Sequence, residues 1–149
     1  MSVESPVVTL EELRRFTADQ LPFCAEMNIG VEAVSLGEAT ARFGYDDRWT
    51  RPVDFIAGPV LMALADAAMY WAILATVGIV PLAVTNELKM NFLRPAIGGD
   101  VLATARILKL GRRIAYGTAD VYMGGAPDRL VAHATTSYIM PEGWHITDV

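Results

Sequence analysis

The sequence contains very few of the residues that form disulfides and metal sites. Its 149 residues include one cysteine, Cys24, and two histidines, His133 and His145. One cysteine excludes an intrachain disulfide, and the two histidines lie in unlike sequence contexts, which argues against a metal site. We therefore expect no metal and no cofactor.

Charged residues are also scarce. They make up 19% of the chain, against 53% apolar residues, and the net charge is −5. An acidic balance argues against nucleic-acid binding, and the first residues lack the basic segment and apolar run of a secretory signal. The length suits one domain. We expect a cytoplasmic protein, and we attribute the surplus of apolar residues to contacts between subunits of a homo-oligomer.

The longest hydrophobic run lies between Gly58 and Gly78 and contains a single ionisable residue, Asp66. Gly58 is suited to the N-cap of a helix, Pro59 to its first position and Gly78 to its end. The pattern predicts a helix over residues 59–77, roughly 28 Å long.

A helix that is apolar on every side has to be buried, either in a membrane or inside a protein. A charge in the middle of a membrane span is unfavourable, and the rest of the chain has the patterns of strands rather than of a second span. We expect no membrane association and a helix wrapped by a curved antiparallel sheet. Asp66 then has two interpretations: a structural carboxylate that caps a neighbouring loop, or a general base or nucleophile.

The flanking sequence predicts an α+β fold in one domain. A capping-box sequence, T-L-E-E at residues 9–12, opens a short helix, and alternating apolar residues indicate strands. The expected helix covers residues 9–20, and the expected strands are 27–35, 38–45, 83–92, 101–110, 113–123 and 130–140. We divide the chain into an N-terminal helical flap (1–26), the main domain (27–140) and a C-terminal tail (141–149).

Basic residues gather in one part of this acidic chain. Between residues 89 and 113 there is one acid, Asp100, and there are six basic residues: Lys89, Arg94, Arg106, Lys109, Arg112 and Arg113. A local basic region suits a small polyanionic ligand, although a solvated sheet face would have the same composition.

Three segments resemble a known family. AGPVLMALADAAMYWA, AVTNELKMNFLRPAIGGDVLATARILKLGRR and LVAHATTSYIMP are similar to the hotdog-fold thioesterases of the phenylacetate-pathway and 4-hydroxybenzoyl-CoA type, over about residues 27–140. The resemblance implies a hotdog fold with five to six strands, a homodimer or a dimer of dimers, and cleavage of acyl-CoA thioesters at sites between subunits. CoA is then part of the substrate and not a cofactor.

The resemblance also implies roles for three residues. Asp66 would act as base or nucleophile, the Gly58 N–H would bind the carbonyl oxygen, and the Thr85 hydroxyl would position water or the acid. Gly58 and Asp66 lie roughly 12 Å apart along one helix, so they cannot serve one carbonyl from the same chain. We therefore expect Gly58 of one subunit to act with Asp66 of the other.

The substrate-binding candidates follow from the same resemblance. The family usually has His-Gly-Gly before the helix and Asn or Gln about seven residues before the glycine, whereas this chain has Ala57-Gly58-Pro59 and Arg51. Arg51 or Asp54 would take over the role of the missing amide. The remaining candidates are Met62 and Tyr70 for an apolar acyl pocket, and Lys89, Arg94, Arg112 and Arg113 for the CoA phosphates.

Two other functions stay open at this point. A hotdog protein that binds acyl-CoA without turnover would fit the absence of the family's histidine and amide. A hydratase or dehydratase acting on acyl thioesters usually joins a histidine to the helix acid, and this chain has no histidine near the helix in sequence.

Overall fold

The computed structural model describes residues 4–144. Three α-helices are present: α1 (Leu10–Gln20), α2 (Pro22–Glu26) and α3 (Gly58–Val77). The main sheet is formed by six strands: β1 (Ile29–Ser35), β2 (Glu38–Phe43), β5 (Val84–Phe92), β6 (Val101–Leu110), β7 (Ile114–Met123) and β8 (Leu130–Ile139). A separate two-stranded pair, β3 (Thr50–Arg51) and β4 (Phe55–Ile56), precedes α3.

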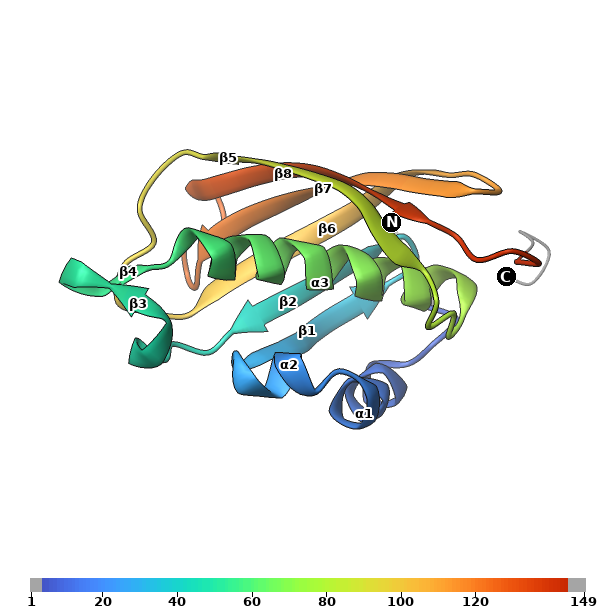
Figure 1. The fold of residues 1–149 in the computed structure, drawn as a ribbon, viewed down its shortest axis with the longest axis horizontal. Coiled ribbons are helices and arrows are strands. Elements are labelled where there is room, and N and C mark those ends of the chain that lie inside the picture. The colour runs from blue at the N-terminus through green and yellow to red at the C-terminus, as the bar shows by residue number, and fades with distance from the viewer. Residues whose placement is uncertain (1–3, 145–149) are drawn as a thin grey trace.

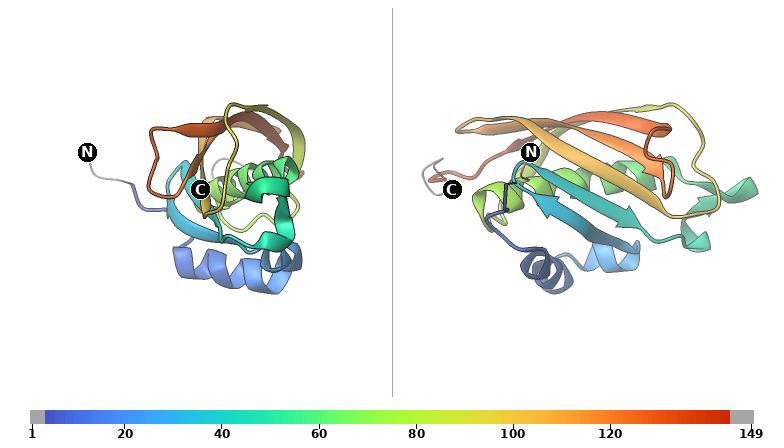
Figure 2. Two further views of the ribbon diagram at one scale, coloured as in Figure 1. Left: turned by 90° about the vertical axis from the view of Figure 1, so that its left-hand side faces the viewer. Right: turned by 180° about the vertical axis from the view of Figure 1, so that it is seen from behind.

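The six strands form one antiparallel sheet in the order β1-β2-β6-β7-β8-β5. The sheet curves around α3, which lies along its concave side, while α1 and α2 lie beside β1 (Figures 1 and 2). The predicted α+β hotdog fold is confirmed. Strand β5 is at one end of the sheet order, so among the described residues its outer edge has no partner strand.

Helix α3 is the core of the domain. It is long and apolar enough to cross a membrane, but 78% of its most hydrophobic 18-residue window is buried inside the protein. Alanines fill much of the inner face of the sheet, for example Ala103 and Ala119, which lets the strands approach the large side chains of the helix. Gly117 has no room for a side chain, because a Cβ there would collide with the Arg106 carbonyl oxygen and lie 3.0 Å from Met69 Cε.

Several predicted boundaries need correction. Ala57 is the N-cap of α3 and Gly58 is its first helical residue, so the prediction of Gly58 as N-cap was wrong. The predicted end is confirmed, since the Gly78 N–H donates to the Leu74 carbonyl at 2.9 Å. The sequence analysis also missed α2, which Pro22 opens in its first turn. Trp144 is buried, and residues 145–149 of the predicted tail, His145 among them, lie outside the described residues.

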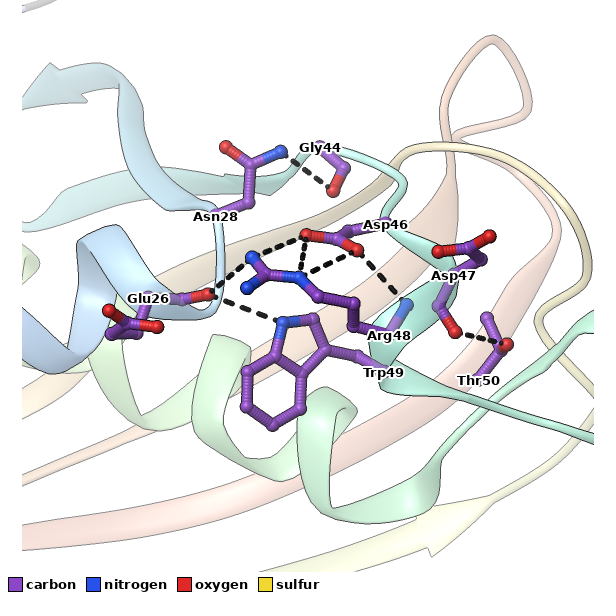
Figure 3. A network of polar contacts seen from close by, with 8 residues as sticks. All are labelled: Glu26, Asn28, Gly44, Asp46, Asp47, Arg48, Trp49 and Thr50. Carbon is purple, nitrogen blue, oxygen red and sulfur yellow. Dashed lines mark hydrogen bonds and ion pairs between the residues drawn. The ribbon is translucent and has the colours of Figure 1, made fainter.

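The connection from β2 to α3 is fixed by a polar network at the end of α2 (Figure 3). The Arg48 guanidinium donates to the Asp46 carboxylate at 2.8 Å and thereby lowers the pKa of Asp46. Arg48 and the Trp49 indole also donate to the Glu26 carbonyl, at 3.4 and 3.3 Å. This network ties the N-terminal helices to the segment that leads to Gly58.

Candidate active site

Asp66 lies in the middle of α3 and is half-buried. The Thr85 hydroxyl donates to its Oδ1 at 2.8 Å, and the Tyr138 hydroxyl lies 2.7 Å from the same Oδ1 and 3.0 Å from the Asp66 carbonyl oxygen. No hydrogen-bond donor within residues 4–144 contacts Oδ2. One carboxylate oxygen is thus held by two hydroxyls, and the other is left for a reactant.

Strand pairing explains why these groups meet. Thr85 of β5 is the register partner of Tyr138 of β8, and both face α3 from the inner side of the sheet. Burial, together with the negative charge of Asp66, raises the pKa of the Tyr138 hydroxyl well above its ordinary value. Tyr138 therefore keeps its proton and acts as a donor.

The sequence analysis missed Tyr138. The alternation of β8 identifies it as an inward-facing position, because it alternates with the outward-facing Ser137 and Ile139. Its pairing with Thr85 is a contact between residues 53 positions apart, which no local pattern reports.

Tyr70 has a different role from Tyr138. Its ring stacks on the Tyr138 ring with centroids 6.0 Å apart, and the Phe16 ring of α1 lies 6.4 Å away on a tilted plane. The Tyr70 hydroxyl donates to the Pro81 carbonyl at 3.1 Å. Tyr70 thus helps to form the site without a hydrogen bond to Asp66.

A cavity of about 280 Å³ opens beside Asp66. We call it the Asp66 cavity, and among residues 4–144 Asp66 is its only charged lining residue. Burial and the Asp66 charge raise the pKa of the Cys24 thiol in its wall to about 11. The cavity is lined by three parts of the chain: the start of α2 (Leu21, Phe23, Cys24), α3 (Asp66, Ala67, Tyr70) and the sheet with its connector (Pro81, Ala83, Val84, Thr85, Tyr138).

A second cavity, of about 460 Å³, opens at the start of α3. We call it the Gly58 cavity. It contains two arginines and no acid, and its lining comprises Arg51, Phe55, Ile56, Gly58, Leu61, Phe92, Leu93, Arg94, Pro95 and Ala96. The first N–H groups of a helix have no intrahelical partner and lie at the positive end of its dipole. The Gly58 cavity can therefore stabilise negative charge.

The two cavities share no lining residue. Gly58 and Asp66 are eight residues apart in one helix, so about 12 Å of helix axis separates them. Within one chain the structure does not bring the two groups together. Arg51 and Arg94 line the same cavity as Gly58, and Thr85 and Tyr70 line the same cavity as Asp66.

Two of the predicted binding residues line neither cavity. Met62 is only partly buried on α3. Asp54 is exposed, has a positive φ of 56°, and accepts a hydrogen bond from the Tyr45 hydroxyl at 3.2 Å. Their assignment to substrate binding therefore finds no support in the geometry of one chain.

The predicted phosphate-binding residues are also dispersed. Arg94 lies beside the Gly58 cavity, where its guanidinium donates to the Leu130 carbonyl at 2.6 Å. Arg112 and Arg113 lie in the turn between β6 and β7, at the other end of strands that are ten residues, about 33 Å, long. Lys89 is exposed on β5. These residues of one chain cannot bind one nucleotide together.

Within residues 4–144, no histidine lines either cavity. His133 lies on the outer face of β8, the side of the sheet away from α3, with its Nδ1 2.7 Å from an Asp120 carboxylate oxygen. The chemistry of the two cavities therefore rests on a carboxylate, hydroxyls, arginines and backbone N–H groups.

The chain is similar to known proteins in sequence and in fold. Residues 54–128 match the thioesterase superfamily. A crystal structure of a suspected thioesterase from Silicibacter sp. TM1040 is 32% identical, with 94% of this chain and 96% of that chain covered and a TM-score of 0.83. A mutant of the phenylacetic acid degradation protein PaaI from Thermus thermophilus is 27% identical, with coverage of 80% and 99% and a TM-score of 0.70. A suspected esterase of Saccharolobus solfataricus is 29% identical over 114 residues, which are 75% of this chain and 74% of that protein.

Proposed function

The chain belongs to the thioesterase superfamily, and from this premise we propose that it hydrolyses acyl-CoA thioesters to the free acid and CoA. The observation that carries the proposal is the Asp66 carboxylate, whose Oδ1 is held by two hydroxyls beside a cavity. A half-buried carboxylate with one oxygen anchored and the other available suits a base or a nucleophile.

In the base mechanism, Asp66 Oδ2 accepts a proton from water, and the water oxygen attacks the thioester carbonyl carbon. The tetrahedral oxyanion collapses, the carbon–sulfur bond breaks, and the CoA sulfur takes up the proton from Asp66. In the nucleophilic mechanism, Oδ2 attacks the carbonyl carbon, the carbon–sulfur bond breaks and CoA leaves as the thiolate. Water then hydrolyses the resulting anhydride to the free acid and the Asp66 carboxylate, and the proton released in this step protonates the thiolate. In both, the Thr85 hydroxyl keeps the carboxylate in place.

The oxyanion requires a donor that one chain cannot supply at Asp66. We assign this role to the Gly58 N–H of a second subunit, at the positive end of its helix α3. The unpartnered edge of β5 supports this arrangement, since it carries the exposed apolar residues Val84 and Phe92. Antiparallel pairing of two β5 edges brings the Phe92 end of one strand to the Thr85 end of the other. A dimer, or a tetramer of two dimers, then has two equivalent sites per dimer.

The arginines of the Gly58 cavity support a role on the CoA side. Arg51 and Arg94 provide positive charge beside the proposed oxyanion donor, and guanidinium groups bind phosphates through paired hydrogen bonds. Lys89, Arg112 and Arg113 remain candidates only where a second subunit brings them to the same nucleotide.

The direct test is release of free thiol from a panel of aryl, short-chain and medium-chain acyl-CoAs. We expect CoA release from at least one member. A folded, dimeric protein that gains thermal stability from acyl-CoA but releases no CoA would be a binding protein instead. A change in enoyl-thioester absorbance without thiol release would indicate a hydratase. Among the described residues no histidine lines either cavity, which disfavours that function.

A further inference from the structure

We propose that the Asp66 cavity is the acyl-binding chamber, and that α2 is the wall that selects the acyl group. The proposal rests on the proposed function, because it assigns the two sides of the same thioester to two cavities. It gives the N-terminal segment, predicted from the sequence only as a helical flap, a role in selecting the acyl group.

The charges of the two cavities indicate which end of the thioester each one binds. In the described part of the chain, Asp66 is the only charged residue that lines the Asp66 cavity, and no cation lines it. The phosphates of CoA are repelled by a carboxylate that no cation offsets. The Gly58 cavity contains Arg51 and Arg94 and no acid. The phosphate-bearing side of the thioester therefore extends toward the Gly58 cavity, and the acyl side enters the Asp66 cavity.

The lining favours an apolar acyl group. Leu21, Phe23 and Val84 contribute hydrocarbon surface, and the Tyr70 hydroxyl is already engaged by the Pro81 carbonyl. The volume of about 280 Å³ exceeds the roughly 150 Å³ of an apolar cavity that holds benzene. An acyl group with one aromatic ring or a short to medium alkyl chain fits this space, whereas a highly polar one would lose hydrogen bonds to water.

The wall comes from the N-terminal helices. Cys24 is fully buried behind the chamber, and Phe23 is 48% exposed in its wall. The Phe16 ring of α1 packs on Tyr70, which stacks on Tyr138. Figures 1 and 2 show α1 and α2 side by side next to β1. Phe23 is thus a side chain whose truncation enlarges the chamber without removing a core residue.

The test compares two exposed phenylalanines, one from each cavity. Phe23 is 48% exposed in the Asp66 cavity, and Phe92 is 53% exposed in the Gly58 cavity. We expect Phe23→Ala to shift kcat/KM toward longer or bulkier acyl groups, with the ratio of medium-chain to short-chain substrates changing on the order of tenfold. We expect Phe92→Ala to change all chain lengths by a similar factor. Leu36→Ala, in the turn between β1 and β2, serves as the unchanged control.

Binding of non-hydrolysable acyl-CoA thioethers of the same chain lengths provides a readout that does not need turnover. A shift in their relative Kd values with Phe23→Ala supports the chamber, even if wild type releases no CoA and the hydrolytic function fails. The proposal is overturned if Phe23→Ala leaves both the kcat/KM ratios and the Kd ratios unchanged. It is equally overturned if Phe92→Ala changes these ratios and Phe23→Ala does not. Val84→Phe, which narrows the chamber from the edge strand, should shift the preference toward shorter acyl groups.

Discussion

The Gly58 cavity and the Asp66 cavity lie along the same helix but differ in chemical content. The Gly58 cavity has the positive end of α3 and two arginines, without an acid. The Asp66 cavity has one carboxylate and the hydroxyls of Thr85, Tyr70 and Tyr138, without a cationic side chain. Thioester cleavage needs both kinds of group at one carbonyl. One chain therefore contains both kinds of group, but in two separate cavities.

The separation has a physical advantage. A carboxylate in the first turn of α3 would accept hydrogen bonds from the free N–H groups and be stabilised by the helix dipole. It would then be a weaker base and nucleophile. In the middle of the helix those N–H groups are already bonded, so Asp66 is held by hydroxyls instead. A site between subunits can then combine an unneutralised carboxylate with an unoccupied oxyanion donor.

The largest effect should come from removing the carboxylate. We expect Asp66→Asn to lower kcat at least about a hundredfold, a loss of roughly 2.7 kcal/mol, because an amide cannot accept the proton or attack the carbonyl. Thiol release is the measurement. Asp128→Asn, at an exposed loop position, is the control and should keep wild-type kcat. Full activity of Asp66→Asn would remove Asp66 from the mechanism.

Mixed dimers test whether the two cavities act across subunits. A Cβ at Gly58 would lie 3.5 Å from the Phe92 ring, an ordinary contact, so we expect Gly58→Val to fold while obstructing the carbonyl site. We expect each of Gly58→Val and Asp66→Asn to be inactive alone. An equal mixture should regain about a quarter of wild-type activity, because half the dimers are mixed and each mixed dimer has one intact site. Absence of recovery after mass spectrometry has shown subunit exchange would contradict the shared site.

The anchoring of Asp66 can be tested with two stacked tyrosines. Tyr138→Phe removes a hydrogen bond to the carboxylate, so we expect kcat to fall on the order of tenfold. The loss should appear in kcat rather than in KM, because the anchored carboxylate acts in the chemical step. Tyr70→Phe is the matched control, because its hydroxyl bonds to the Pro81 carbonyl. The role of Tyr138 is disproved if Tyr138→Phe keeps the same kcat as Tyr70→Phe.

Removing the arginine proposed to bind a CoA phosphate should have a smaller effect on kinetics. We expect Arg94→Gln to raise KM for acyl-CoA about fivefold, roughly 1 kcal/mol, with little change in kcat, because the interaction is exposed and uniform along the reaction. The effect should decrease at high salt. Arg112→Gln, in the distant β6–β7 turn, should have the weaker effect. The opposite ranking would assign the phosphates to that turn.

Alkylation of the Cys24 thiol tests whether the wall of the Asp66 cavity opens, and no effect on activity is expected from this measurement. Its pKa of about 11 leaves about a thousandth of the thiol ionised at pH 8. We expect alkylation by iodoacetamide, followed by mass spectrometry, to be slow at pH 8, faster as pH rises toward 11, and fast at pH 8 in urea. Rapid labelling of the folded protein at pH 8 would show that the wall formed by α2 opens readily.

Much of the fold is readable from local sequence. The apolar run of α3, its proline at the start and its glycine at the end are signals within one segment. Strand β6 has the predicted bounds, 101–110, because turn-forming residues mark both of its ends, with Gly98-Gly99-Asp100 before it and Gly111 after it. The helix α2 and the β3–β4 pair were missed since each is only a few residues long, and their contacts, such as the hydrogen bond from Trp49 to Glu26, are made with distant parts of the chain.

The candidate site was only partly predictable. Asp66 stands out in sequence as the single charge of an apolar helix, and Thr85 came from the family resemblance. Tyr138 was found only through the pairing of β5 with β8. The basic window of the sequence does not form one patch within a single chain, because ten-residue strands carry Arg94 and Arg112 to opposite ends of the sheet.

The sequence by itself determined that α3 is a buried helix and that Asp66 is its one charge, because hydrophobic periodicity and helix-end residues act over a few neighbouring positions. Only the tertiary structure decided which side chains meet Asp66, which cavity each arginine borders and that α2 walls the Asp66 cavity. Those outcomes depend on strand register and packing between residues far apart in the chain, and the energies that fix them belong to the assembled core.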